Sequence, residues 1–183
     1  MKRTKYKYLF IVTAFIMAFY IGQTNPVLTE GSEKTQHLNN EEIGQAEKII
    51  VGYYPAWKSY TEYTPDKVDV SKLTHINYAF ANIGPDYRIS MGYPDKDPAN
   101  FEMFQKLKKI NPDLKVLISV GGWNWSGRFS DMAANDENRT KFADSCVEFL
   151  TKYKLDGVDL DWEYPVVGGL ETNLKSPKDK QNF

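Results

Sequence analysis

Three acids stand at every second position near the end of the chain, within the stretch DGVDLDWEYP from Asp156 to Pro165. They are Asp159, Asp161 and Glu163, and the residues between them are the large and apolar Val158, Leu160 and Trp162. Residues two apart on a β-strand share a face, so the acids are expected on one face and the apolar residues on the other. A solvated acidic loop would not carry such spacers, so the pattern predicts a strand whose acidic face does chemistry.

Acids at this spacing affect one another's protonation. Neighbours on one strand face lie about 6.6 Å apart, and three buried carboxylates so close cannot all be ionised cheaply. At least one pKa must rise, and a proton is then held within the row. Glu163 is the outermost member, and a protonated glutamate at the mouth of a site is a natural general acid.

The row fits glycoside cleavage, but not the usual scheme with two carboxylates. That scheme places carboxylates on both sides of the scissile bond, about 5–5.5 Å apart for retention and about 6.5–9.5 Å apart for inversion. Neighbours on one strand face approach the substrate from one side only. We therefore expect the row to supply an acid and a helper, while the attacking group comes from elsewhere. A sugar with a 2-acetamido group can supply it from its own carbonyl oxygen.

Two other interpretations of the acids are weaker. A divalent-metal site is one alternative, but calcium loops use glycine, asparagine and water-accessible spacers rather than Val, Leu and Trp. A purely structural row is the other. It would cost several kcal/mol for each carboxylate buried without a paired cation, and no Lys or Arg is interleaved. Asp156 has the opposite parity and is expected to be a structural residue at the strand entrance.

Four apolar runs predict the strands that position these residues, and each is bounded by turn-forming residues. They are Lys48–Trp57, Leu73–Ile83, Leu114–Trp123 and Leu155–Pro165. Between the last two runs, helical spacing joins Phe142, Cys146, Phe149, Leu150 and Tyr153, and Asn135 or Asp136 can cap the start. A shorter helix is predicted at about residues 100–110. Strands that alternate with helices indicate an α/β fold with a parallel sheet.

Two α/β folds compete, an open doubly wound sheet and a closed (β/α)8 TIM barrel. No Gly-rich phosphate loop follows the first strand, which disfavours the nucleotide-binding form of the open sheet. Aromatic and acidic residues cluster at the carboxyl ends of the strands, where a barrel builds its active site: Trp57, Phe80, Trp123 and Glu163. A full barrel needs about 250 residues. We therefore predict a barrel present only as its first four strands, that is, truncated.

The N-terminus has a different character. Basic residues among positions 2–7 precede an apolar run from Leu9 to Ile21, which is typical of an export signal. The run is short for a membrane span of about 20 residues, so an uncleaved anchor is the weaker alternative. We predict a signal peptide at 1–24, a polar linker at 25–47 and a catalytic unit at 48–183. The protein is then expected to be secreted, with no membrane association after cleavage.

Composition excludes some function classes. The net charge of −1 does not suggest nucleic acid or an anionic membrane as a partner. The single cysteine, Cys146, excludes an internal disulfide and a Cys-rich zinc site. Aromatic residues make up 14% of the chain, which fits either a core or a cleft for sugar faces.

The chain resembles the family 18 glycoside hydrolases, the chitinase family, over about Lys48 to Phe183. The family signature D-x-x-D-x-D-x-E is complete here as Asp156, Asp159, Asp161 and Glu163. A second signature, S-x-G-G on the preceding strand, is present as Ser119, Gly121 and Gly122 around Val120. Two signatures on consecutive strands, in order, make the resemblance specific.

The resemblance implies a role for each acid. Glu163 is similar to the general acid that protonates the glycosidic oxygen. Asp161 resembles the aspartate that turns toward Glu163 and holds the acetamido N–H, and Asp159 resembles the partner that shares or takes up the proton. Tyr53 and Ser119 are similar to the hydroxyl residues that bond to this inner aspartate.

The resemblance also implies a substrate cleft. Trp57 and Trp123 look like sugar-stacking residues, with core packing as the alternative for each. Phe80 and Tyr164 are expected to line the cleft, together with Gly121 and Gly122. His75 is expected to be structural.

The implied function is chitinase activity, the hydrolysis of β-1,4-N-acetylglucosamine linkages in chitin and chitooligosaccharides by substrate-assisted retaining catalysis. The implied partner is chitin or its oligosaccharides, and no metal or organic cofactor is implied. Cleavage of a glycoprotein chitobiose core or of peptidoglycan is an open alternative. The rival class is a non-catalytic chitin-binding fragment, because the second half of the barrel is missing. The residues do not indicate an oligomeric state.

Overall fold

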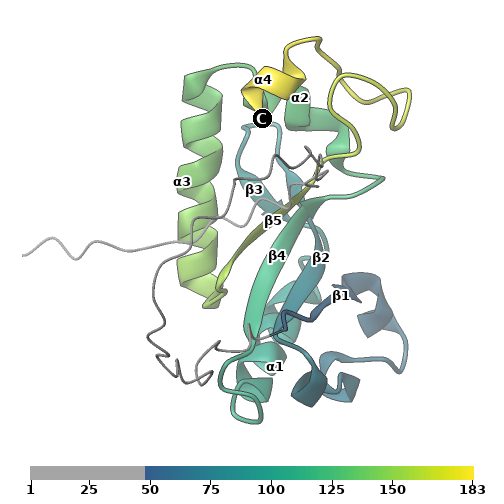
Figure 1. Cartoon of the computed structure of the whole chain (residues 1–183), viewed down its shortest axis with the longest axis vertical. Coiled ribbons are helices and arrows are strands. Elements are labelled where there is room, and N and C mark those ends of the chain that lie inside the picture. Colours follow the sequence, from purple (N-terminus) through teal and green to yellow (C-terminus); the bar gives the residue numbers. More distant parts are fainter. Residues whose placement is uncertain (1–47) are drawn as a thin grey trace, which may run out of the picture. The chain divides into compact units, whose positions relative to one another are not determined.

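The computed structural model describes residues 48–183 and shows a sheet with four parallel strands (Figure 1). Their order across the sheet follows the chain: β1 (Val51–Pro55), β2 (His75–Ile83), β4 (Lys115–Gly121) and β5 (Gly157–Asp161). Each strand lies within one of the four apolar runs, so the predicted parallel α/β architecture is confirmed. The last strand, however, is shorter than its run and ends at Asp161.

A fifth strand was missed by the sequence analysis. β3 (Ile89–Met91) pairs antiparallel with the end of β2, with Ile83 opposite Ile89. Three residues are too few to show a period in the sequence. The Ser145 hydroxyl accepts a hydrogen bond from the Ile89 amide at 2.9 Å, which ties β3 to a distant helix.

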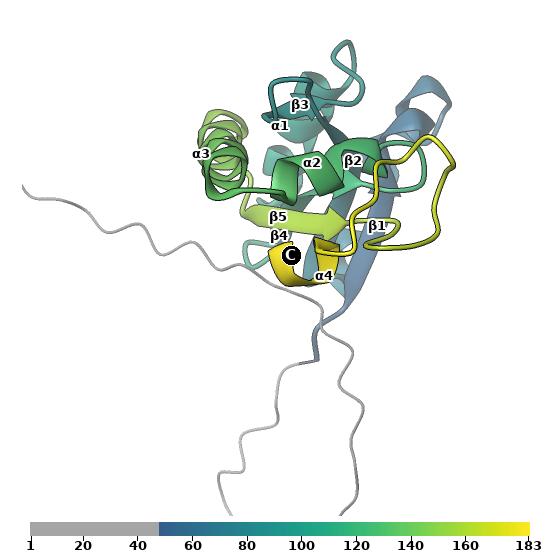
Figure 2. The same cartoon turned by 90° about the horizontal axis from the view of Figure 1, so that it is seen from above.

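The helices are α1 (Asp97–Leu107), α2 (Phe129–Ala133), α3 (Asp136–Tyr153) and α4 (Asp179–Asn182). The prediction for α3 is confirmed, because the Asn135 side chain caps its start by accepting a hydrogen bond from the Asn138 amide at 2.9 Å. α1 begins earlier than predicted, with Pro98 in its first turn, and ends at Leu107. Figure 2 shows α1, α2 and α3 on the same side of β5.

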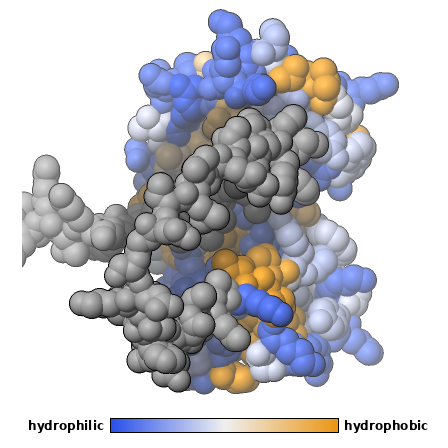
Figure 3. Space-filling view, in the orientation of Figure 1, coloured by the Kyte–Doolittle hydropathy of each residue, from blue (hydrophilic) through white to orange (hydrophobic). Residues whose placement is uncertain are grey.

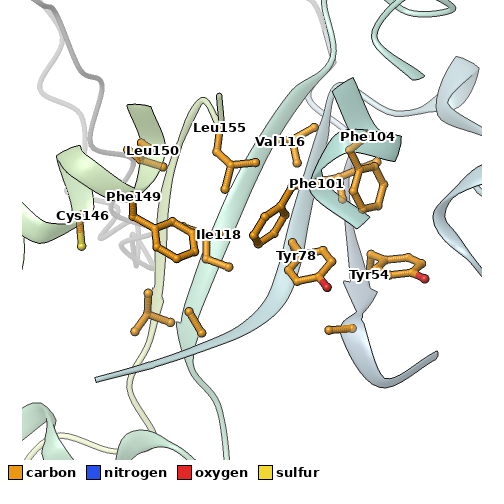
Figure 4. Packing of buried hydrophobic residues seen from close by; sticks show 14 of the residues in the cluster. Tyr54, Tyr78, Phe101, Phe104, Val116, Ile118, Cys146, Phe149, Leu150 and Leu155 are labelled. Atoms are coloured by element: carbon orange, nitrogen blue, oxygen red, sulfur yellow. The ribbon is translucent and has the colours of Figure 1, made fainter. Parts of the chain in front are cut away.

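The core lies between the strands and these helices (Figure 4). Alternate strand residues such as Tyr78 and Ile118 point into it and are at most 1% exposed. From α1 come Phe101 and Phe104, and Phe101 meets the Tyr78 ring edge-on at 4.8 Å. Burying one such side chain contributes about 1.5–3 kcal/mol, so this layer fixes the strands that carry the site.

The opposite face of the sheet curves inward. The four parallel strands of a flat sheet would place β1 about 14 Å from β5. Yet Tyr53 on β1 donates a hydrogen bond to Asp159 on β5 at 2.8 Å. An open doubly wound sheet carries helices on both faces, whereas a concave face lined by side chains is the interior of a (β/α)8 barrel. The arrangement is that of part of such a barrel.

Leu160 is more exposed than the other apolar residues between the acids. Its parity directs it toward the helical layer, but it is 38% exposed, because β5 is the last strand in the order. Val51, on the strand at the other end of the order, is 49% exposed. In Figure 3 apolar patches (orange) remain open to solvent between hydrophilic surfaces.

The predicted export signal and polar linker lie outside the described residues. Within residues 48–183, none of the helices combines the length and the apolar character that a membrane crossing requires.

Candidate active site

Glu163 does not lie on the strand that carries the other two acids. β5 ends at Asp161, and Glu163 lies beyond it, so the prediction of three acids in register on one strand was wrong for its last member. The pairing ends there because Asp161 stands opposite Gly121, the last residue of β4, which has φ +110°. The Gly122 amide still donates to the Asp161 carbonyl at 2.8 Å, and the main chain of Glu163 is then bonded to side chains instead.

Asp159 is held by two hydroxyl donors on one oxygen. Ser119 stands opposite Asp159 in the strand register and donates to Oδ2 at 2.7 Å, and Tyr53 donates to the same atom at 2.8 Å. Burial and the negative charges of Asp159 and Asp161 raise the pKa of Tyr53 to about 12. The Tyr53 hydroxyl therefore keeps its proton at neutral pH and is always a donor. The two hydroxyls expected to bond to the inner aspartate do so.

The protonation of Asp161 is affected by its surroundings. Its pKa is raised by burial and then by the negative charges of Glu163 and Asp159. The crowding of the acids thus raises a pKa in the row, as the two-residue spacing predicted. A carboxyl with a raised pKa beside two other acids can hold or share a proton, which is what acid–base chemistry needs.

Asp156 belongs to the scaffold. It accepts hydrogen bonds from the Val116 amide at 2.7 Å and from Lys108 Nζ at 2.5 Å, at the entrance of β5. These contacts agree with the structural role expected from its parity. His75 lies at the start of β2, where its Nδ1 is 2.8 Å from the Thr74 hydroxyl, at the end of the strand away from the acids.

Gly121 and Gly122 are needed for close packing of the main chain. A Cβ on Gly121 would lie 2.3 Å from the Asp161 carbonyl oxygen, and one on Gly122 would lie 2.8 Å from the Phe80 ring. Both residues also have positive φ, which other residues rarely adopt. Gly121 borders the aromatic cleft described next. Their packing role is thus distinct from the substrate contact expected of them.

An aromatic cleft of about 350 Å³ opens at the carboxyl ends of β2 and β4. Its lining comprises Trp57, Phe80, Tyr93, Gly121, Trp123, Asn124 and Trp125. Trp57 lies on a short 3-10 helix (Ala56–Tyr60), is 43% exposed, and stacks on Phe80 with centroids 6.3 Å apart. The register of β2 against β4 shifts between Ala79 and Ala81, so Phe80 occupies a bulge that redirects its ring.

Of the four predicted aromatic residues, Trp57, Phe80 and Trp123 meet in this cleft and Tyr164 does not. Tyr164 is half-exposed and follows Glu163 directly, so it stands beside the acid instead. The peptide bonds Ala79–Phe80 and Glu163–Tyr164 are cis.

Sequence reasoning missed several residues of the site. Tyr93 and Trp125 pack together with centroids 5.5 Å apart at the far wall of the cleft. Ser126 and Asn173 contact the main chain of Glu163. The run GGWNWS that follows β4 carried a usable signal for Trp125 and Ser126, because it begins where a barrel strand ends.

Among residues 48–183, no group of three or more His, Cys, Asp or Glu side chains is placed to hold a metal ion.

The family model for glycosyl hydrolases family 18 matches residues 49–183. Chitinase A1 of Niallia circulans is 43% identical over 179 aligned positions, covering 73% of this chain and 26% of the relative. Among solved structures, chitinase ChiA74 from Bacillus thuringiensis superimposes with a TM-score of 0.68 at 37% identity, covering 73% of this chain and 30% of that one. Ostrinia furnacalis Group IV chitinase in complex with allosamidin also gives 0.68, at 34% identity, with coverage of 74% and 37%. The chain therefore spans between 26% and 37% of the length of these proteins.

Proposed function

Because the chain belongs to the glycosyl hydrolases of family 18, we propose that the protein is a chitinase that cleaves β-1,4-linked N-acetylglucosamine polymers with retention of configuration. The arrangement of the three acids at the end of β5 carries the proposal. Asp159 is held by Tyr53 and Ser119, Asp161 beside it has a raised pKa, and Glu163 follows where the strand ends. The relatives' names supply the substrate class, since several are chitinases.

The proposed reaction uses the substrate as its own nucleophile. Glu163 gives a proton to the glycosidic oxygen as the bond from that oxygen to the anomeric carbon breaks. The acetamido carbonyl oxygen of the same sugar forms the new bond to the anomeric carbon, which gives a cyclic intermediate. Water then opens the ring and passes its proton to Glu163, so the configuration is retained and the enzyme is restored.

The two aspartates support the acetamido group in this scheme. An Asp161 carboxylate accepts the acetamido N–H and offsets the positive charge that develops on the ring nitrogen. Asp159 precedes it by two positions on β5, and the hydrogen bonds from Tyr53 and Ser119 fix its carboxyl group. In this scheme the acids approach the sugar from one side and the acetamido oxygen attacks from the other, so no carboxylate nucleophile is needed.

The aromatic cleft suits a chain of sugars. The apolar faces of pyranose rings pack on aromatic side chains, and Trp57 and Trp123 expose about half of their surface in this cleft. We propose that chitin and chitooligosaccharides bind along this cleft.

A product-configuration experiment tests the proposal. The intact protein is incubated with chitopentaose, and the anomer formed first is followed by NMR, with cellopentaose as the matched substrate without acetamido groups. We expect the β-anomer from chitopentaose, no cleavage of cellopentaose, and inhibition by a thiazoline mimic of the cyclic intermediate. A covalent sugar trapped on a carboxylate of residues 156–163 would overturn the mechanism.

Chitin binding without cleavage is the second candidate. The observation that favours it is the exposure of Trp57 and Trp123 in the aromatic cleft, which binding of a polysaccharide alone would also need. Retention on chitin with no product from any chitooligosaccharide would support it. For either function we propose export of the protein, with residues 1–24 as the signal and 25–47 as a linker, since a polymeric substrate cannot cross a membrane.

A further inference from the structure

Glu163 lies outside the sheet, so its position depends on side-chain contacts to its main chain. The Glu163 amide donates to Ser126 Oγ at 2.8 Å, and its carbonyl accepts from Asn173 Nδ2 at 3.1 Å. Within residues 48–183, no hydrogen bond from a neighbouring strand holds this residue, because β5 ends two positions earlier. The direction in which the Glu163 side chain leaves the backbone is therefore set by Ser126 and Asn173.

The Ser126 hydroxyl contacts three main-chain groups from two segments of the chain. Ser126 is fully buried, and its Oγ lies 2.9 Å from the Gly122 carbonyl oxygen and 3.1 Å from that of Asp161. The single O–H can donate to either carbonyl or be shared between them, while the oxygen accepts from the Glu163 amide. One hydroxyl thus connects the turn after β4 to the residues on both sides of Trp162.

The surroundings leave this hydroxyl and its partners little room to shift. The Trp162 ring stacks on Phe129 with centroids 5.2 Å apart and planes within 12°, so the residue between the two acids is fixed in the core. On the other side, a Cβ on Gly169 would lie 2.2 Å from the Glu163 carbonyl oxygen. Asn173 is 9% exposed and reaches Glu163 past this glycine.

We propose that Ser126 is a positioning residue for the proton transfer by Glu163, with Asn173 as its counterpart on the carbonyl side. The inference rests on the proposed function. A general acid must come within about 2.6–3.2 Å of the atom that it protonates, and a misplacement of about 1 Å can cost about 100-fold in rate. Ser126 touches no substrate in this role, and it acts by fixing where the Glu163 carboxyl stands.

The test compares two leaving groups in the intact protein. Ser126→Ala should lower kcat on chitopentaose about 10- to 100-fold, with KM changed less than about threefold. On a dinitrophenyl glycoside of chitobiose the loss should be less than about threefold, because that leaving group departs without protonation. This dependence on the leaving group is a readout that a merely structural defect would not produce.

Ser145→Ala is the matched control. Ser145 is also buried, accepts a backbone N–H (Ile89, 2.9 Å) and donates to a backbone carbonyl (Phe142, 2.7 Å), but it lies between α3 and β3. We expect a comparable fall in Tm with kcat unchanged on both substrates. Asn173→Asp, which removes the amide donor from a loop residue, gives a second variant with the same expected leaving-group pattern if Ser126→Ala does not fold.

The outcomes separate the two proposals. If wild type cleaves both substrates, the function stands. If Ser126→Ala and Asn173→Asp then lower kcat by the same factor on both substrates, or do not lower it on either, the positioning role is overturned. A wild-type protein that cleaves neither substrate overturns the proposed function and the inference with it.

Discussion

The Tyr53 hydroxyl donates to Asp159 Oδ2 at 2.8 Å, although the two residues lie on the first and last of the four parallel strands. Small side chains on the intervening strands leave room for this contact, since Ala79 and Ser119 occupy the row of Asp159. This hydrogen bond therefore depends on the curvature of the sheet, and it also holds the Asp159 carboxyl group in place. Any change that flattens the sheet should also remove a donor from Asp159.

Replacing Glu163 with Gln should separate catalysis from binding. The amide keeps the size of the side chain but cannot give up a proton, so kcat on chitopentaose should fall at least about 10²–10⁴-fold. Binding of chitopentaose, measured by calorimetry, should change little. Glu148→Gln is the control, because Glu148 is exposed and forms an ion pair with Arg88. Near-normal turnover by Glu163→Gln would remove this residue from the proposed role.

The raised pKa of Asp161 predicts a pH-dependent gain in stability for Asp161→Asn. Because the folded-state pKa lies above the unfolded value of about 3.9, the contribution of Asp161 to folding is fully present below that value and is lost as pH rises through the folded pKa. Asn has no charge to bury, so the Tm of the variant should exceed that of wild type at pH 7. The difference should vanish near pH 3. Asp113→Asn, at an exposed position, should show no such trend.

Tyr53→Phe should remove one hydrogen bond to Asp159 without creating a cavity in the core. The change removes one of two hydroxyl donors to Oδ2 and leaves Ser119, so kcat should fall about tenfold, as expected for a lost hydrogen bond to a charged group. NMR of ring-labelled tyrosine gives an independent check. The tyrosine signal that wild type shows and the variant lacks belongs to Tyr53. Because the pKa of Tyr53 is raised to about 12, this signal should not titrate below about pH 11. Titration near pH 10 would contradict the contact.

Trp57→Ala should reduce affinity more than turnover. Loss of the stacking surface on Phe80 should raise KM for chitopentaose about tenfold, while kcat changes less, because Trp57 is remote from the proton transfer. Trp57→Phe should recover part of the affinity. Tyr153→Ala is the control, since Tyr153 packs against Phe149 in the helical layer rather than in the cleft. An unchanged KM would make Trp57 a packing residue only.

Residues 48–183 expressed alone should self-associate rather than form an active monomer. Strands β1 and β5 end the parallel order with Val51 and Leu160 partly exposed, and open strand edges invite pairing. Sizing chromatography, thermal melting and a chitooligosaccharide assay test this, with Leu160→Lys expected to lower the association. A monodisperse monomer with a cooperative melt and measurable turnover would show that this unit is self-sufficient.

The features that the sequence predicted well depend on local patterns. Strand positions followed from apolar runs, and α3 followed from helical spacing with its cap at Asn135. The alternation of acids with apolar residues placed Asp159 and Asp161 on the concave face, because a strand's side-chain period is fixed by its backbone.

The features that it did not predict depend on contacts between distant segments. The departure of Glu163 from the sheet follows from the turn of Gly121 on the neighbouring strand, which no spacing within residues 156–165 reveals. The bond from Glu163 to Ser126 joins residues 37 positions apart. Identifying such partners requires knowing which turn faces which strand end, and that is a property of the tertiary fold.

The paired glycines after β4 have a consequence for how related sequences are classified. Glycine is required at both positions, because a side chain at 121 would collide with the Asp161 carbonyl and one at 122 with the Phe80 ring. A protein that had lost its acids, and served only to hold a polysaccharide, would need the same two glycines to pass its strands at this distance. Their presence is thus diagnostic of architecture and uninformative about turnover. A survey for active enzymes should instead look for Glu163 together with Ser126 and Asn173, whose side chains bind the main chain of Glu163.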